Sequence, residues 1–262
     1  MGTAESVQKI PFWTENKIRW LSEAADHLGF TKVLAGECAK WFCEGDHIAD
    51  IGCGIGYLST DLLDHVDRVT AIDINKEVLD HLKNRAVARG CPNDRLSILR
   101  ADAFKELPDA QMFDGMTASF FGQIPQLVDF AQKHVKGNAV WIRKNWDSHR
   151  FSTCATPIRR LRFKEDCEAL DKMGIPYRTE CFDLEMGQPF RNENEAIDFF
   201  REYSREDETD NEGKTGDGSL SYLKMLTRTE DDVFPYMFSS VRNIGIIIVS
   251  ADELRASIGQ KR

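Results

Sequence analysis

The sequence predicts an α/β fold in which helices cover both faces of a doubly wound, mostly parallel sheet. Short apolar runs alternate with segments of helical periodicity along most of the chain, as expected of βαβ units. The first run passes through a glycine-rich turn, Asp50 to Gly56, directly into a helix. The second and third runs lead directly to aspartates, Asp73 and Asp102. Because parallel strands end at one edge of a sheet, these observations also predict a shared site there.

Composition favours a globular protein that works on small molecules. The 262 residues are 42% hydrophobic and 29% charged, which is ordinary for a globular domain. No apolar run approaches the roughly 20 residues that span a bilayer, so no membrane association is expected. The seven cysteines have scattered spacings without a zinc or iron–sulfur motif, which predicts a cytoplasmic protein without a metal. A net charge of −9 argues against nucleic acid as the main partner.

Each element follows from periodicity and from residues that begin or end helices. Helical spacing of Trp13, Lys17, Trp20, Ala24 and Leu28 indicates a first helix ending near Gly29. Further helices are expected at 32–41, 57–65, 76–89, 124–135, 164–173 and 193–203. The first strand should end at Asp50, and later strands should occupy 68–73, 96–100, 113–121, 139–143, 177–186 and 243–249.

These elements divide the chain, 1–262, into parts of a single domain. Residues 1–45 form an N-terminal helical cap, and residues 46–186 form the core with the glycine turn. The polar stretch 187–240 is predicted to be an inserted lid, and 241–262 the final strand and tail. The acidic, glycine-bearing run 204–218 within the lid is interpreted as a solvated loop.

The glycine turn indicates a nucleoside ligand. A tight turn needs residues without a Cβ, and a nucleoside must approach its backbone closely. The dinucleotide fingerprint is GxGxxG, whereas this chain has Gly52-x-Gly54-x-Gly56 with Tyr57 at the third glycine position of that fingerprint. Asp50, two residues before the first glycine, does not belong to that fingerprint, and its carboxylate is expected to face a cation in the turn.

In these motifs the sequence resembles the class I S-adenosylmethionine-dependent methyltransferases of the small-molecule type. The resemblance rests on Asp50 to Gly56, on Asp73 at the end of the second strand, on Ala101-Asp102-Ala103 and on strand 113–121. It covers about residues 46–250. It implies a Rossmann-like sheet of seven strands in the order 3-2-1-4-5-7-6, with the last strand antiparallel.

The resemblance also implies roles for individual residues. Asp50 and Cys53 would lie near the amino acid part of S-adenosylmethionine, and Gly52, Gly54 and Gly56 would admit the cofactor. Asp73 would bind the ribose hydroxyls beside Ile74, which agrees with the strength of hydrogen bonds to a carboxylate. Asp102 and Ala103 would hold the adenine edge, and Ser119 would lie near the methyl group. S-adenosylhomocysteine would be the product.

The acceptor should lie beyond the ends of the first, fourth and fifth strands. This places Phe120, Phe121 and Gln123 after the fourth strand, and Trp146, His149 and Arg150 after the fifth. His149 is the candidate general base, and Trp13 and Trp20 are candidates to close over the acceptor. The tetrapeptide DPPY or NPPY of nucleic-acid amino methyltransferases is absent, since residues 119–122 read Ser-Phe-Phe-Gly.

A basic, aromatic segment follows the fifth strand. Between Arg143 and Lys164, basic residues that include Arg150, Arg159 and Arg162 outnumber the single acid, Asp147. One interpretation is that they pair with an anionic or aromatic small-molecule acceptor, and the other is a solvated surface.

The sequence thus predicts methyl transfer to O, N, C or S of a small molecule by direct displacement. A nicotinamide-dependent oxidoreductase and a non-catalytic S-adenosylmethionine-binding protein remain alternatives. A thiol enzyme for metalloids would need cysteines such as Cys38, Cys43, Cys154 and Cys181 to meet in space. The acceptor and the oligomeric state are left open.

Overall fold

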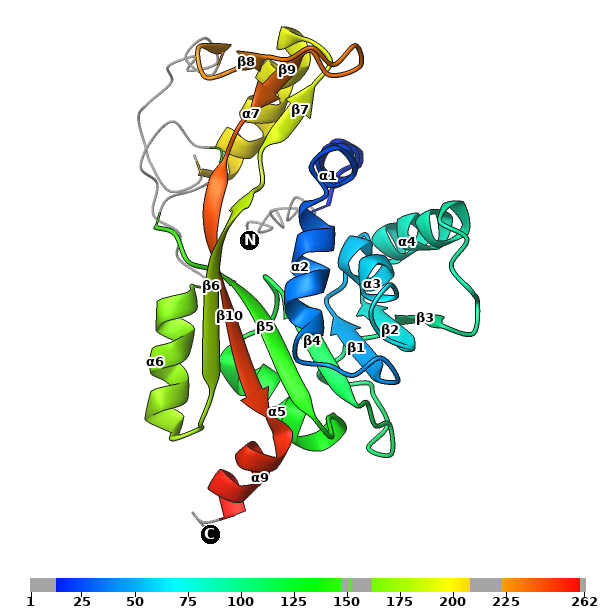
Figure 1. The fold of residues 1–262 in the computed structure, drawn as a ribbon, viewed down its shortest axis with the longest axis vertical. Coiled ribbons are helices and arrows are strands. Elements are labelled where there is room, and N and C mark those ends of the chain that lie inside the picture. The colour runs from blue at the N-terminus through cyan, green and yellow to red at the C-terminus, as the bar shows by residue number, and fades with distance from the viewer. Residues whose placement is uncertain (1–12, 148–150, 152–161, 208–222, 260–262) are drawn as a thin grey trace, which may run out of the picture.

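The computed structural model describes residues 13–147, 151, 162–207 and 223–259 (Figure 1). Its main sheet has seven strands in the order β3-β2-β1-β4-β5-β10-β6. They are β1 (His47–Ile51), β2 (Arg68–Asp73), β3 (Leu96–Arg100), β4 (Gly115–Ser119), β5 (Asn138–Lys144), β6 (Arg178–Glu185) and β10 (Val241–Ser250). β1 pairs in parallel with β2 and β4, and β10 runs antiparallel to both β5 and β6. The predicted fold class and strand order are confirmed.

Helices cover both faces of this sheet (Figure 1). One face packs against α1 (Glu15–Leu28), α2 (Phe30–Ala39), α3 (Tyr57–Leu62) and α4 (Lys76–Ala88). The other packs against α5 (Ile124–His134), α6 (Phe163–Met173) and α9 (Ala251–Gly259). Buried aliphatic residues alternate along each central strand: Ile246 and Ile248 of β10 point to the first core, whereas Ile247 and Val249 point to the second. The sheet is therefore buried on both sides, as its apolar strands predict.

Several predicted boundaries have visible local causes. Thr14 caps α1 by accepting a hydrogen bond from the Lys17 N–H, and Asn75 caps α4 by accepting from the Glu77 N–H. β4 ends earlier than the predicted strand 113–121 because Phe120 leaves the extended conformation, with φ of +49°, and it begins later because Phe113 forms only an isolated bridge with Val135. The final helix α9 was not predicted from the sequence.

The segment 187–240, which is predicted to be a lid and is named the lid below, differs most from the expectation. Residues 187–240 read as a polar stretch with one helix, and that helix is present as α7 (Glu193–Asp207). The structure adds a three-stranded sheet in the order β7-β9-β8, from β7 (Gln188–Phe190), β8 (Thr227–Arg228) and β9 (Tyr236–Phe238). Its core is an aromatic cluster that includes Phe190, Phe199, Phe200 and Phe238. The polar-stretch interpretation is therefore wrong for this part of the lid. The loop prediction for 204–218 is wrong for residues 204–207, which continue α7, and residues 208–218 lie outside the described residues.

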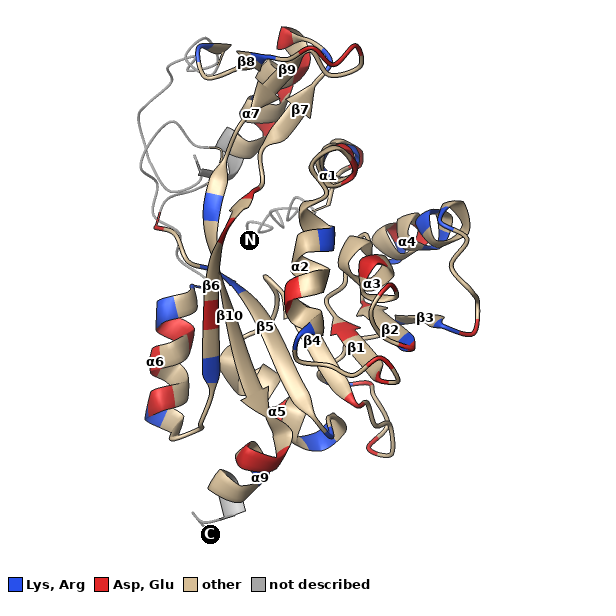
Figure 2. Cartoon of the chain, in the orientation of Figure 1, with Lys and Arg blue, Asp and Glu red and all other residues tan. Residues whose placement is uncertain are grey.

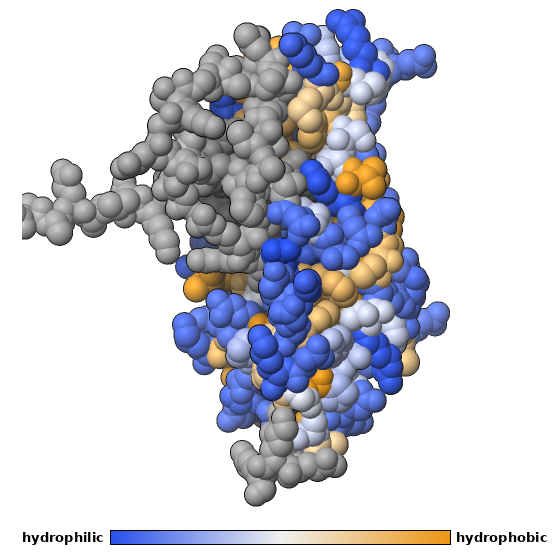
Figure 3. All heavy atoms as spheres, turned by 90° about the vertical axis from the view of Figure 1, so that its left-hand side faces the viewer, coloured by the Kyte–Doolittle hydropathy of each residue, from blue (hydrophilic) through white to orange (hydrophobic). Residues whose placement is uncertain are grey.

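The described residues carry many charged side chains (Figure 2). Lys and Arg are interspersed with Asp and Glu on α4 and α6 (Figure 2). On the side that carries α6, the visible described residues are mostly hydrophilic, and apolar residues form only small groups (Figure 3). Within the described part of the chain, no helix combines the length and hydrophobicity needed to cross a membrane.

Candidate functional site

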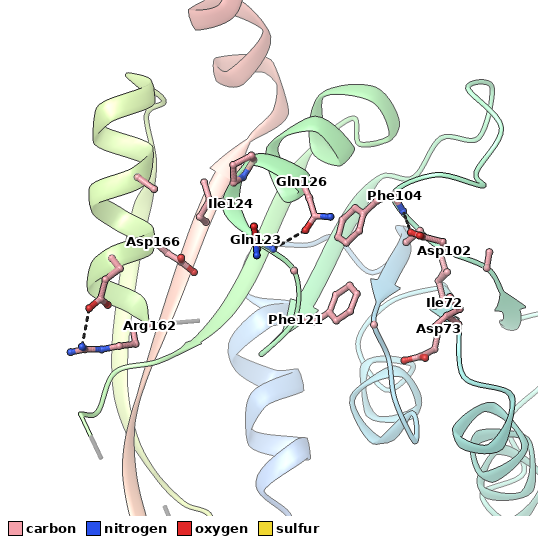
Figure 4. Close-up of a pocket in the computed structure, with 18 residues that line it drawn as sticks. Ile72, Asp73, Asp102, Phe104, Phe121, Gln123, Ile124, Gln126, Arg162 and Asp166 are labelled. Carbon is pink, nitrogen blue, oxygen red and sulfur yellow. Dashed lines mark hydrogen bonds and ion pairs between the residues drawn. The ribbon is translucent and has the colours of Figure 1, made fainter. Parts of the chain in front are cut away.

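A cavity of about 1000 Å³ opens at the carboxyl ends of β1 to β4. At this point the chain order reverses between β1 and β4, which is where open α/β sheets bind ligands. Seven of the predicted site residues line the cavity: Gly52, Asp73, Ile74, Asp102, Ala103, Phe121 and Gln123. Asp73 and Asp102 lie at one end, whereas Arg162 and Asp166 lie at the other (Figure 4). Sequence reasoning therefore found one end of the cavity.

The glycine turn is fastened to the end of β2. The Gly52 and Cys53 N–H groups donate to the Ile72 carbonyl over 2.8 and 3.1 Å. The Gly54 N–H donates to Oδ2 of Asp73 over 2.9 Å, and the Asn75 N–H donates to Oδ1 over the same distance. Each carboxylate oxygen can accept a further hydrogen bond. Asp73 is thus held in a fixed orientation and keeps capacity for a ligand.

Aromatic rings lie against the first two glycines. A Cβ on Gly52 would stand 2.2 Å from the Phe121 ring, and one on Gly54 would stand 3.0 Å from the Trp13 ring. Phe121 also stacks on Phe104, with centroids 5.6 Å apart and planes at 3°. The two phenylalanines form an apolar wall between the carboxylate end and the helix end of the cavity (Figure 4).

Asp50 lies beneath the turn, outside the cavity wall. Its carboxylate is 1% exposed and accepts hydrogen bonds from the Ser59 hydroxyl at 2.5 Å and the Thr117 hydroxyl at 3.1 Å. Burial raises its pKa to about 6 against the opposing effect of these hydroxyls, and Asp73 adds to the rise. Burial likewise raises the pKa of the neighbouring Cys53 thiol, with further contributions from both aspartates. Cys53 is therefore a neutral turn residue at ordinary pH.

Ile74 is an exposed apolar residue of the cavity wall, whereas Asp102 is held by hydrogen bonds and an ion pair. Ile74 is 65% exposed at the cavity, an unusual position for an isoleucine and a suitable surface for a flat apolar ligand. Asp102 accepts from the Phe104 N–H at 3.0 Å and pairs with Lys105 at 2.8 Å. The Lys105 ammonium, with the Phe104 N–H, holds the Asp102 pKa below its ordinary value.

At the end of β4, two predicted acceptor residues meet. Phe120 has the only positive φ among described residues other than glycine, a conformation that concentrates at functional sites. Its ring contacts Trp146 edge to face, with centroids 6.0 Å apart. Ser119, Phe120 and Trp146 do not line the described cavity. Phe120 and Trp146 pack against the first core instead.

A buried ion pair supports the helix end of the cavity. The Arg143 side chain is fully buried and donates from Nε to Asp166 over 2.5 Å and from Nη2 to the Gly122 carbonyl over 3.3 Å. Burial lowers the Arg143 pKa and raises that of Asp166, although each partner opposes the effect on the other. The pair thereby joins β5, α6 and the turn after β4.

Other predicted residues lie elsewhere. Trp20 is buried in the aromatic cluster of the lid, where its ring contacts Phe199 at 5.0 Å. Gly56 faces Leu82, whose Cδ1 lies 2.2 Å from the Cβ position. His149 and Arg150 fall outside the described residues.

The basic segment is partly accounted for by internal pairs. Arg143 binds Asp166, and Arg162 pairs with Asp147 and, at 2.9 Å, with Glu165. Arg159 lies outside the described residues, as does Cys154 of the proposed thiol group. Within the described ranges, no group of three or more His, Cys, Asp or Glu side chains is placed to hold a metal.

Apart from Arg162, which belongs to the basic segment proposed to face the acceptor, the helix end of the cavity was missed by sequence reasoning. It is formed by residues at the start of α5 and in the first turns of α6, including Gln126, Glu165 and Asp166, with Phe104 on the opposite side. The sequence could have indicated these residues only by their place in the chain. α6 follows the fifth strand, so its first turn lies at the same edge of the sheet as the cavity.

Comparisons with known proteins agree with this geometry. Residues 48–138 match the family model of a methyltransferase domain. Over 65 residues the chain is 38% identical to the ribosomal RNA small subunit methyltransferase A of Rhodococcus erythropolis. That match covers 24% of this chain and only about a fifth (21%) of the relative's length.

Two of the similar solved structures match most of this chain. The YcgJ protein of Bacillus subtilis has a TM-score of 0.52 at 15% identity, and the BH2331 protein of Bacillus halodurans has 0.52 at 11% identity. Each comparison covers 84% of this chain and 98% of the other. At such identities the similarity establishes the fold alone.

Proposed function

We propose that this chain, which carries a class I S-adenosylmethionine-dependent methyltransferase domain, transfers the cofactor's methyl group to a small-molecule acceptor. The observation that carries the proposal is the cavity at the ends of β1 to β4, because the methyltransferase domain match at 48–138 includes the residues that form its carboxylate end. A volume of about 1000 Å³ is at the upper end of ordinary ligand sites and leaves room beside a nucleoside cofactor.

The residues present fit S-adenosylmethionine. Asp73 offers a fixed carboxylate for two vicinal hydroxyls, and Ile74 offers an exposed apolar surface for a base. Asp102 lies at the adjoining strand end with a carboxylate that stays ionised. Phe104 and Phe121 add aromatic surface on which a base can stack. The bound cofactor would supply an electrophilic methyl group on a positively charged sulfur.

The chain's own contribution is alignment and exclusion of water. The Arg143–Asp166 pair fixes the turn after β4 through the Gly122 carbonyl, and this turn presents Phe121 and Gln123 to the cavity. His149 remains our candidate to remove a proton from the acceptor, because it follows β5 in the chain. Exchange of His149 for Ala should lower kcat at neutral pH if the acceptor carries a proton.

A small molecule is favoured over RNA as the acceptor. The ribosomal RNA methyltransferase match is the observation that favours RNA, but it covers 65 residues only. The net charge is −9, and the described arginines of the basic segment, Arg143 and Arg162, are paired with the chain's own carboxylates. RNA binding would require a steep dependence on salt, so salt-independent acceptor binding would exclude it.

We further propose a cytosolic location and an acceptor that is anionic or aromatic. Six cysteines in the described part of the chain are free thiols, which supports a reducing compartment. Support for an anionic acceptor now rests on the sequence around Arg150 and Arg159, whereas Phe121 and Phe104 support an aromatic one.

Calorimetric titration with S-adenosylhomocysteine tests the proposal, with NAD as the competing ligand. We expect S-adenosylhomocysteine to bind and NAD not to bind. The Asp73→Asn variant should lose about 10- to 100-fold in affinity, as expected for hydrogen bonds to a charged group. Asp80→Asn is the matched control, because Asp80 is exposed on α4 and pairs with Lys76 and Lys83. Binding of NAD instead would support the oxidoreductase alternative, and cofactor binding without any methylated product would support a non-catalytic binder.

A further inference from the structure

Helix α1 lies between the lid and the core and contacts both. Towards the core, Ile18, Ala24 and Ala25 are buried in the cluster that includes α3. The Tyr57 hydroxyl of α3 also donates to Asp26 of α1 over 2.7 Å. Tyr57 stands at the position of the third glycine in the dinucleotide-binding fingerprint. This departure from the fingerprint attaches α3, the helix after the glycine turn, to α1.

Towards the lid, α1 makes both apolar and polar contacts. Trp20 is 1% exposed within the lid's aromatic cluster, and its carbonyl accepts from the Gln188 side chain over 3.1 Å. Glu23 pairs with Arg191 at 2.7 Å, and Arg19 pairs with Glu195. These contacts explain why Trp20 is not at the cavity: its ring anchors α1 to the lid.

The start of α1 is held by the lid helix. The Thr14 hydroxyl donates to Glu202 of α7 over 2.5 Å while the same oxygen caps α1 by accepting from the Lys17 N–H. Trp13 directly precedes Thr14, and its ring lies against Gly54. Gly54 in turn donates to Asp73, which lines the cavity. A continuous series of contacts therefore runs from the lid to the cofactor end of the cavity.

We propose that α1 couples the lid to the cofactor site, with Trp13 as the residue that retains S-adenosylhomocysteine and Glu202 as the lid residue that positions it. This rests on the proposed function. Coupling of two sites requires an element that both contact, and α1 is such an element. When the lid releases Glu202 from Thr14, Trp13 loses one of the contacts that hold its ring over Gly54, in addition to its packing against the first core, and the product leaves faster. The lid thus controls product release.

Release of the product measures this coupling directly. Full-length protein is loaded with radiolabelled S-adenosylhomocysteine and chased with excess unlabelled compound. Trp13→Ala and Glu202→Ala should each raise the dissociation rate on the order of tenfold, within the usual range of coupling between sites. Asp198→Ala is the matched control, since Asp198 is exposed on the same helix. It should release product at the wild-type rate. Glu202→Gln keeps an acceptor for the Thr14 hydroxyl and should restore most of the retention.

The double variant Trp13→Ala/Glu202→Ala separates coupling from independent effects. If Glu202 acts through Trp13, the double variant should release product no faster than Trp13→Ala alone. Multiplying rate increases would overturn the proposal, as would a wild-type rate for Glu202→Ala. Glu202→Gln as fast as Glu202→Ala would also contradict it. A wild-type chain that does not bind S-adenosylhomocysteine at all would instead refute the proposed function.

Discussion

Replacement of the buried Asp50 by Asn tests whether the chain tolerates an unfavourable charge beneath the glycine turn. The rise of the Asp50 pKa from 3.8 to about 6 means that the folded protein binds more protons than the unfolded one between these pH values. The contribution of Asp50 to stability is therefore fully present below pH 3.8 and is lost as pH rises through about 6. At about 1.4 kcal/mol per pKa unit, the loss is about 3 kcal/mol above pH 7.

Asparagine imitates the protonated carboxyl group. Its oxygen can accept from Ser59, and its amide can donate to the Thr117 hydroxyl, so both present contacts have a neutral counterpart. The variant should equal the wild type near pH 4 and exceed it by about 3 kcal/mol at pH 8. Urea unfolding of both proteins at several pH values measures the difference in their free energies of unfolding. Subtracting one free energy from the other cancels the contributions of the other titrating groups.

The same substitution should weaken the binding of S-adenosylmethionine more than that of S-adenosylhomocysteine. The two ligands differ by the methyl group and its positive charge, so their affinity ratio isolates the interaction of Asp50 with that charge. Two results would refute the reasoning: a wild type that gains stability over the variant as pH rises, or equal losses of affinity for both ligands. The stability result would refute the cost of burying the Asp50 charge. The affinity result would refute the role of that charge in binding the sulfonium.

Two further substitutions probe packing around the site. Gly56→Ala should cost about 2–4 kcal/mol in urea unfolding, because a Cβ would meet Leu82 at 2.2 Å in addition to the left-handed φ of +75°. Gly90→Ala is the control with a similar φ of +66° and open space around the Cβ, and its cost should stay near 1 kcal/mol. Equal costs would show that Leu82 moves aside freely. Asp166→Ala should cost about 3–5 kcal/mol by leaving the buried Arg143 unpaired, and the double variant with Arg143→Met should recover most of it. If the double variant does not recover this stability, the Arg143–Asp166 pair contributes more to folding than the neutralisation of two buried charges.

The parallel sheet could be predicted from the sequence because its elements are locally determined. The strands 68–73 and 96–100 were located to the residue, since each is a short apolar run bounded by polar residues. The positions of Asp73 and Asp102 at one edge then followed from the shared direction of parallel strands. This reasoning uses spacing along the chain alone.

The lid and the far wall of the cavity depend on contacts that spacing does not encode. β8 has two residues and β7 and β9 have three, too few for an alternating pattern. Trp20 has the helical spacing of a buried residue, but the pattern does not say whether it packs on the core or on the lid. The Arg143–Asp166 pair is formed between β5 and α6, and the sequence suggested solvent or ligand as the partner of this arginine.

The glycine turn shows what a motif does and does not identify. Each glycine marks a close approach, but in this structure the approaching group is Phe121 at Gly52, Trp13 at Gly54 and Leu82 at Gly56. Leu82 belongs to the packing of α4, whereas the Phe121 ring lines the cavity and the Trp13 ring lies against Gly54, which donates a hydrogen bond to the cavity residue Asp73. Gly52 lines the cavity, but a ligand that approaches it on its Cβ side must first displace Phe121, and the free energy of that displacement lowers its apparent affinity. Because Phe121 also offers a ring on which a base can stack, Phe121→Ala should weaken the binding of S-adenosylhomocysteine in a calorimetric titration, and stronger binding would show that the ring mainly blocks Gly52.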